Sequence, residues 1–153
     1  MLYKTHLAFS ILLSVILSHF YNLNFLSIVL ILLSTFIPDI DIPTSKIGKK
    51  FKISSFLANK IFHHRGFFHS LIFITLVYIV LKLIIETSYT LPILIGLSSH
   101  IFLDIFTKEG IALFTPFYNK RISGFITTGS LSEKAIFFFL IFLILIFSYN
   151  SFF

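Results

Sequence analysis

The sequence has 153 residues, of which 57% are hydrophobic and only 12% are charged, and its formal net charge is +6. A water-soluble domain of this size carries about twice that share of charged residues and cannot bury so much apolar surface, so a soluble globular protein is excluded. The absence of cysteine excludes disulfides, thiolate metal sites and cysteine nucleophiles.

Five apolar segments, taken in chain order, predict an all-α, polytopic membrane bundle of about five helices in a single domain covering residues 1–153. The segments are Tyr3–Phe20, Leu23–Ile37, Phe67–Ile85, Leu91–Phe106 and Glu133–Phe147. Backbone groups in lipid must pair within the chain, and no alternating barrel pattern is present, so each segment is expected to be a helix. The first segment lacks a small-residue cleavage motif, and we expect it to be retained as a membrane helix.

Basic residues lie mainly in the two connections over residues 42–65 and 107–132. Basic connections stay in the cytoplasm, which predicts a multi-pass inner-membrane protein with a cytoplasmic N-terminus and an external C-terminus. Topology and anionic lipid headgroups explain the positive charge better than nucleic acid does, so no nucleic-acid partner is expected.

On this topology, each of the five segments brings at least one potential ligand or base to the cytoplasmic end of the bundle, whereas His19 and Glu86 lie near the outer face. The residues at the cytoplasmic end are His6, Asp39, Asp41, His64, His69, His100, Asp104 and Glu133. Ionisable groups at membrane depth are energetically expensive and usually functional, and a shared cation offsets that cost. The sequence therefore predicts one polar site at this end.

The ligand types favour a divalent metal, with zinc first and manganese or iron as alternatives. His100 and Asp104 are four residues apart and share one helix face, so both can reach one ion. Asp39 and Asp41 flank one residue in a turn, where one can ligate while the other orients a ligand or bridges a second ion.

Each motif also has an ordinary structural interpretation. His6 can be an interfacial anchor, residues 38–42 a helix stop, and His100 with Asp104 an intrahelical pair. Ser130 and Glu133 match a capping box, a role compatible with a site role for Glu133. Arg65 either binds lipid phosphate non-specifically or stabilises charge on a phosphoryl substrate. The joint placement of these residues favours the shared site.

These residues also resemble a known family in their order along nearly the whole chain. The matching stretches are Thr5-His6, Pro38-Asp39-Ile40-Asp41, His64-Arg65-Gly66-Phe67-Phe68-His69-Ser70, Ser99-His100-Ile101-Phe102-Leu103-Asp104 with Thr107 and Gly110, Thr115-Pro116-Phe117, and Gly129-Ser130 with Glu133. They resemble the YdjM-like family of inner-membrane, metal-dependent hydrolases, some of them under LexA control. The resemblance implies metal ligation by His6, Asp39, Asp41, His64, His69, His100 and Asp104. Phe68 departs from the small residue expected there, between two of these ligands.

The function that we expect is metal-assisted hydrolysis of a lipid-linked phosphoester or ester at the cytoplasmic membrane interface, with membrane lipid as the substrate. The metal would lower the pKa of bound water toward ~7. Asp41 or Glu133 could act as general base, and Arg65 could hold a phosphate. Two alternatives stay open, namely a metal-ion transporter and a metal-binding membrane scaffold without catalysis. A looser similarity in ligand order and type relates the pattern to zinc-dependent phospholipases C.

Overall fold

The computed structural model describes residues 1–41 and 66–150 of the chain. Five α-helices occur there: α1 (Tyr3–Phe20), α2 (Phe25–Ser34), α4 (Leu71–Ile84), α5 (Thr87–Ile105) and α6 (Leu131–Asn150). Two short 3₁₀ turns, η1 (Pro38–Asp41) and η2 (Phe67–His69), lie between α2 and α4. The described part of the chain contains no named strand, which confirms the prediction of an all-α fold.

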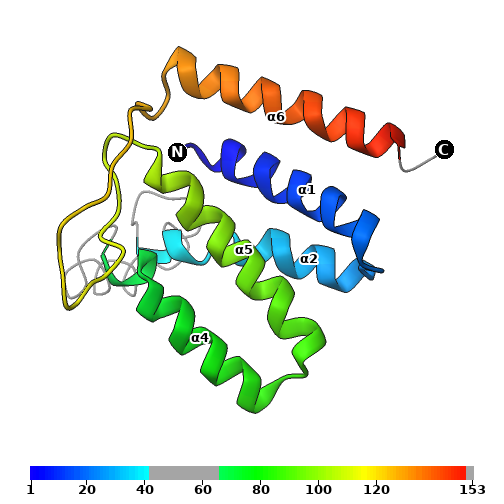
Figure 1. Cartoon of the computed structure of the whole chain (residues 1–153), viewed down its shortest axis with the longest axis horizontal. Coiled ribbons are helices and arrows are strands. Elements are labelled where there is room, and N and C mark those ends of the chain that lie inside the picture. The colour runs from blue at the N-terminus through cyan, green and yellow to red at the C-terminus, as the bar shows by residue number, and fades with distance from the viewer. Residues whose placement is uncertain (42–65, 151–153) are drawn as a thin grey trace.

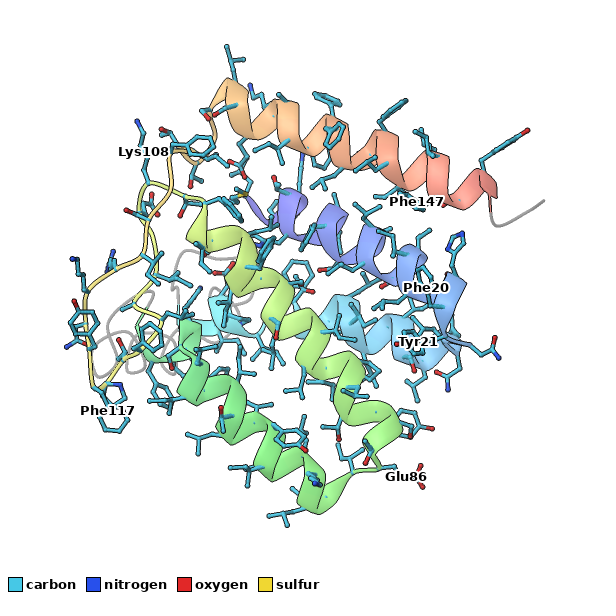
Figure 2. The ribbon with its side chains drawn as sticks, in the orientation of Figure 1. Phe20, Tyr21, Glu86, Lys108, Phe117 and Phe147 are labelled. Atoms are coloured by element: carbon cyan, nitrogen blue, oxygen red, sulfur yellow. The ribbon has the colours of Figure 1, made fainter. Side chains whose placement is uncertain are left out.

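Successive helices run in opposite directions, so that helix ends far apart in the sequence meet on one side of the bundle (Figure 1). The start of α1, turn η1, the start of α4, the end of α5 and the start of α6 lie at the same end of the bundle. The long connection between α5 and α6 extends from this end as well. The turns at Phe20 and Tyr21 and at Glu86 lie at the opposite end (Figure 2).

Side-chain caps set several helix boundaries. Asn24 accepts a hydrogen bond from the amide of Ser27 at the start of α2 (2.8 Å), and Ser70 accepts one from Phe73 at the start of α4 (3.2 Å). These bonds satisfy amide groups that no helical carbonyl can reach. The cap at Ser70 also explains a difference from the sequence prediction, because it divides the expected continuous segment from Phe67 into η2 and α4.

Helices α2 and α5 pack at very close range through Gly96. A β-carbon added at Gly96 would collide with the Ser34 hydroxyl and with the carbonyl oxygen of Ile31 on α2. Small residues allow two helix backbones to approach each other in this way, as is common in membrane proteins. On the other side of the bundle, α1 packs against α6 through Ala8, Leu12 and Leu140.

Among the described residues, two helices, α5 and α6, are long and apolar enough to cross a membrane. Helix α6 is mostly exposed, as expected for a helix whose outer face contacts lipid rather than protein. Helices α2 and α4 are about 15 and 21 Å long by their helical rise, less than the ~30 Å of a hydrocarbon core. Local thinning of the bilayer or shallow placement would accommodate their shorter length.

Candidate metal centre

The structure brings together five of the predicted ligands at the end of the bundle. His6 comes from α1, Asp39 from η1, His69 from η2, and both His100 and Asp104 from α5. The four side chains other than Asp39 are buried, and Asp39 is 20% exposed. Residues that are far apart in sequence therefore form one histidine–carboxylate cluster, which we call the HD cluster.

The separations between the ligand atoms are longer than hydrogen bonds and similar to the spacing around a metal ion. His69 Nε2 and His100 Nε2 lie 3.9 and 3.5 Å from Asp39 Oδ1. The same two nitrogens lie 3.7 and 3.6 Å from Asp104 Oδ2. Hydrogen bonds of this kind span ~2.7–3.2 Å. A tetrahedral zinc with bonds of ~2.0–2.1 Å holds its ligand atoms about 3.3–3.4 Å apart. Asp39, His69 and His100 therefore form one grouping with metal-ligand spacing, and Asp104 Oδ2 faces both of its imidazole nitrogens.

The tautomer of His100 points to the same conclusion. Its Nδ1 lies 2.8 Å from the backbone carbonyl oxygen of Thr35, which can only accept a hydrogen bond. Nδ1 therefore carries a proton, and in the neutral ring the Nε2 lone pair faces the carboxylates of Asp39 and Asp104. This buried Nε2 makes no hydrogen bond to any described residue. A lone pair facing two anionic oxygens requires a cation or an added proton between them.

His6 lies on the other side of Asp104. Its Nε2 is 3.3 Å from Asp104 Oδ1, and its ring stacks on that of His100 with 3.9 Å between ring centroids. The N-terminal ammonium of Met1 lies 2.6 Å from the same oxygen. One oxygen of Asp104 thus faces His69 and His100, while the other faces His6. His6, His100 and Asp104 form a second grouping with metal-ligand spacing, which shares His100 with the first.

Asp39 is the member of the HD cluster that reaches the surface. Burial alone would raise the pKa of its carboxyl group, but the facing rings of His100 and His69, when they are protonated, outweigh burial and lower the pKa to about 2. Asp39 is therefore ionised at neutral pH. Asp39 is therefore the cluster residue whose side chain is in part accessible from outside the protein.

Glu133 is buried but binds a different set of groups. Its Oε1 accepts hydrogen bonds from the amide of Leu2 (2.5 Å) and the hydroxyl of Thr5 (2.9 Å). Its Oε2 accepts one from the amide of Gly129 (2.6 Å), and the Glu133 amide donates to Ser130 Oγ (3.3 Å). The predicted cap is present, although the reciprocal bond goes to Gly129 rather than to Ser130. This arrangement favours a structural role for Glu133, joining α1 to α6, over a role as general base.

Three predicted site residues have no described side chain. His64 and Arg65 lie outside the described residues, and only the backbone of Asp41, at the end of η1, is described. Their assignments as ligand, phosphate-binding residue, and ligand or general base stay predictions.

A buried network of hydroxyl groups supports the HD cluster, and the sequence analysis did not single it out. Ser10 Oγ lies 2.6 Å from Thr35 Oγ1 and 3.0 Å from Ser99 Oγ, which joins α1, the end of α2 and α5. Thr35 in turn provides the carbonyl group that orients His100. The sequence feature that could have predicted this network is the presence of serine within apolar helices, where polar side chains usually face a neighbouring helix.

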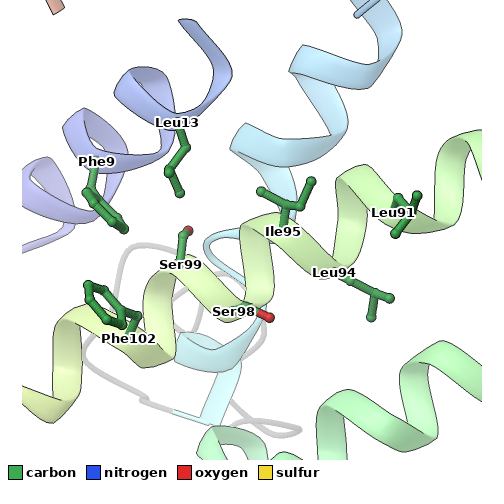
Figure 3. A pocket seen from close by; sticks show the side chains of 8 residues that line it. All are labelled: Phe9, Leu13, Leu91, Leu94, Ile95, Ser98, Ser99 and Phe102. Carbon is green, nitrogen blue, oxygen red and sulfur yellow. The ribbon is translucent and has the colours of Figure 1, made fainter. Parts of the chain in front are cut away.

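An apolar groove of about 420 Å³ lies between α1 and α5 (Figure 3). It is lined by Phe9, Leu13, Leu91, Leu94, Ile95, Ser98, Ser99 and Phe102. Ser98 and Phe102 are each about 200° from His100 around α5, so the groove and the HD cluster occupy different faces of this helix. The groove contains no histidine or carboxylate, and we do not assign the metal centre to it.

Comparison with known proteins gives one family. The chain matches the YdjM inner membrane protein family over residues 1–152. It is 36% identical over 102 residues to the uncharacterized protein YvsG of Bacillus subtilis, covering 65% of this chain and 64% of YvsG. It is 32% identical over 91 residues to the inner membrane protein YdjM of Escherichia coli, covering 56% of this chain and 46% of YdjM. The match to YdjM of Shigella flexneri has the same values. The aligned part is thus less than two thirds of each relative, and no solved structure matches.

Proposed function

This chain belongs to the YdjM family of inner membrane proteins, and on that basis we propose that its HD cluster is the metal centre of a membrane-bound hydrolase. The observation that supports this proposal most strongly is the environment of His100 Nε2. This buried atom faces Asp39 and Asp104 at 3.5 and 3.6 Å, while Nδ1 is held by the Thr35 carbonyl group. A divalent cation between these atoms would satisfy all of them.

Asp39, His69 and His100 would hold the ion, Asp104 Oδ2 would approach it from beside the two imidazole nitrogens, and His6 would face the second oxygen of Asp104. Two carboxylates balance the charge of a divalent cation, which makes its burial among neutral imidazoles energetically acceptable. When bound, such an ion lowers the pKa of water toward ~7 and polarises a carbonyl or phosphoryl oxygen. The partly exposed edge at Asp39 would admit the substrate, whereas a purely structural metal site is closed.

The location of the cluster supports a lipid substrate. The cluster residues lie in or near the terminal turns of their elements, and these element ends lie together at one end of the bundle (Figure 1). This position corresponds to the depth of lipid headgroups. With the basic connections in the cytoplasm, this end faces the cytoplasmic leaflet and the N-terminus is inside. We therefore propose cleavage of a lipid-linked phosphoester or ester there. A transporter would place its site near the bilayer midplane, between broken helices, which these helices do not resemble.

Lipid hydrolysis by the purified full chain tests this proposal. The protein is stripped with a chelator, dialysed, and reloaded with zinc or manganese before incubation with a panel of phospholipids and lipid-linked phosphates. We expect hydrolysis that disappears with the chelator and returns with the metal. Asp104→Asn should abolish the activity because it replaces the buried carboxylate that faces the imidazole nitrogens of His6, His69 and His100.

Glu86→Gln is the matched control, since Glu86 is an exposed carboxylate at the opposite end of the bundle (Figure 2). This variant should keep full activity. Metal-independent hydrolysis, or full activity in Asp104→Asn, would overturn the metal-hydrolase assignment. Stoichiometric metal binding without hydrolysis of any lipid in the panel would favour the scaffold alternative instead.

A further inference from the structure

The connection between α5 and α6, residues 106–130, carries exposed aromatic and basic side chains that the HD cluster does not use. We infer that this segment is a docking surface for anionic lipid headgroups of the membrane in which the helices are embedded. The inference uses the proposed topology but does not depend on hydrolase activity.

The segment is folded, with its own hydrogen bonds and a small apolar interior. Ile111 and Ile122 exchange backbone hydrogen bonds of 3.0 and 2.9 Å, and the backbone amide of Lys108 donates to the carbonyl oxygen of Ile126 at 2.9 Å. Ile111 and Ile126 are buried. The amide of Leu71, at the start of α4, donates to the carbonyl oxygen of Leu113 at 2.9 Å. The segment is therefore held against the helix ends in a defined orientation.

Four aromatic side chains point away from this interior. Phe114 is 48% exposed, Tyr118 55%, Phe125 76% and Phe117 89%. Phe117 lies at the outer tip of the segment (Figure 2). The segment buries Ile111 and Ile126 to fold, so these aromatic rings are not required for its interior. Large aromatic residues exposed together usually mark a protein or membrane contact, and aromatic rings are enriched at headgroup depth.

The positive charge of the segment indicates that its binding partner is anionic lipid. Lys108, Lys120 and Arg121 are exposed, and Glu109 is the one acidic residue in residues 106–130. Lys120 and Arg121 follow directly after the exposed rings of Phe117 and Tyr118. Basic residues beside apolar rings are the pattern by which interfacial segments bind anionic membranes.

The chain itself brings this surface to the membrane. The segment continues from the end of α5 and leads into the start of α6, the two helices long enough to span a bilayer. Such tethering makes lipid contact an intramolecular event with a high effective concentration. A soluble protein partner would have to compete with lipid for the same rings, so we assign the surface to lipid.

Tryptophan fluorescence tests this inference cleanly, because the chain contains no tryptophan. The full chain with Phe117→Trp is reconstituted in vesicles of phosphatidylcholine, with or without phosphatidylglycerol. We expect blue-shifted emission in the anionic vesicles, with quenching by nitroxides near the lipid glycerol and little quenching by aqueous iodide. Adding Lys120→Gln and Arg121→Gln should weaken docking to the anionic vesicles roughly 30-fold, at about 1 kcal/mol per basic residue.

Tyr149→Trp is the matched control, because Tyr149 is 65% exposed on α6 and lies far from these basic residues in the chain. Its emission should not change with phosphatidylglycerol or with the two glutamine substitutions. Water-like, iodide-quenched emission of Phe117→Trp in anionic vesicles would overturn the inference. Equal lipid quenching in both vesicle types, unchanged by the glutamine substitutions, would overturn the assignment to anionic lipid. Neither result bears on metal content or hydrolysis.

Discussion

His100 is the residue on which the metal centre depends most. Its ring is stacked on His6, its Nδ1 is bound by the Thr35 carbonyl group, and its Nε2 faces two carboxylates. A histidine that ligates a metal usually donates its other ring N–H to a carbonyl or carboxylate group, which orients the ring. Thr35 therefore affects the metal through His100 without touching the ion.

The Thr35 hydroxyl group provides a test of this support. Thr35→Val removes the 2.6 Å contact with Ser10 and leaves a buried hydroxyl with one partner fewer. We expect a loss of about 1 kcal/mol in the free energy of unfolding and metal binding weakened by ~10-fold. Thermal unfolding in detergent and equilibrium metal titration measure the two effects.

Thr75→Val serves as the control for Thr35→Val. Thr75 makes the same type of intrahelical bond, to the Leu71 carbonyl oxygen, but it is exposed on α4. It should change neither stability nor metal affinity appreciably. If Thr35→Val binds metal as tightly as the wild type, the hydroxyl network does not support the metal centre.

Glu133→Gln distinguishes the structural role of Glu133 from a catalytic one. Glutamine would direct an amide NH₂ group toward one of the donors now bound by the carboxylate, Leu2 N, Thr5 Oγ1 or Gly129 N. We expect a loss of about 1–3 kcal/mol in stability, with metal content retained. Unchanged thermal stability together with abolished hydrolysis would instead identify Glu133 as the general base.

At the scale of elements, α5 carries most of the site. It supplies His100 and Asp104, packs against α2 through Gly96, and reaches α1 through Ser99. Because α2 leads into η1, the spacing between α2 and α5 also sets the position of Asp39 relative to His100. The close contact at Gly96 should therefore affect metal binding, because it sets the distance between Asp39 and His100.

Gly96→Ala tests this coupling. The added methyl group would collide with Ser34 and Ile31, so α2 and α5 must move apart. Overpacking of this kind costs about 1–3 kcal/mol, and we expect reduced metal affinity as Asp39 moves away from His100. Ser98→Ala, on an exposed position of the same helix, is the control and should leave both quantities unchanged. Wild-type metal affinity in Gly96→Ala would show that metal binding does not depend on the close packing of α2 against α5.

The convergence of five ligands could be predicted from sequence because consecutive helices alternate in direction and their ends carry the polar residues. The start of α5 at Thr87 rather than Leu91 was missed because the polar residues at its start do not continue the apolar pattern. The role of Thr35 could not be predicted, since it rests on a main-chain carbonyl group that every residue has. The partners of Glu133 depend on the packing of α1 against α6, which local sequence does not specify.

At the scale of the whole molecule, the start of α1 and the end of α6 lie at opposite ends of the bundle (Figure 1). With the basic connections inside, the HD cluster and Phe117 should face the cytoplasm and Tyr149 the exterior. The chain has no cysteine, so single-cysteine variants report topology without interference.

Labelling of intact cells with an impermeant maleimide measures this topology. Tyr149→Cys should react from outside, whereas Ser123→Cys should react only after the membrane is permeabilised. Both positions are exposed, so accessibility within the protein is comparable. Reaction of Ser123→Cys in intact cells would reverse the topology and place the HD cluster at the outer face.

Metal analysis of the full chain purified without chelators tests most directly whether the HD cluster holds a metal ion. We predict a stoichiometric divalent metal in the wild type and in His19→Ala, which alters an exposed histidine at the far end of α1. His100→Ala should bind the metal at least ~10-fold more weakly. Equal metal content in His100→Ala and His19→Ala, or none in the wild type even after reloading with zinc, would contradict metal binding at the HD cluster.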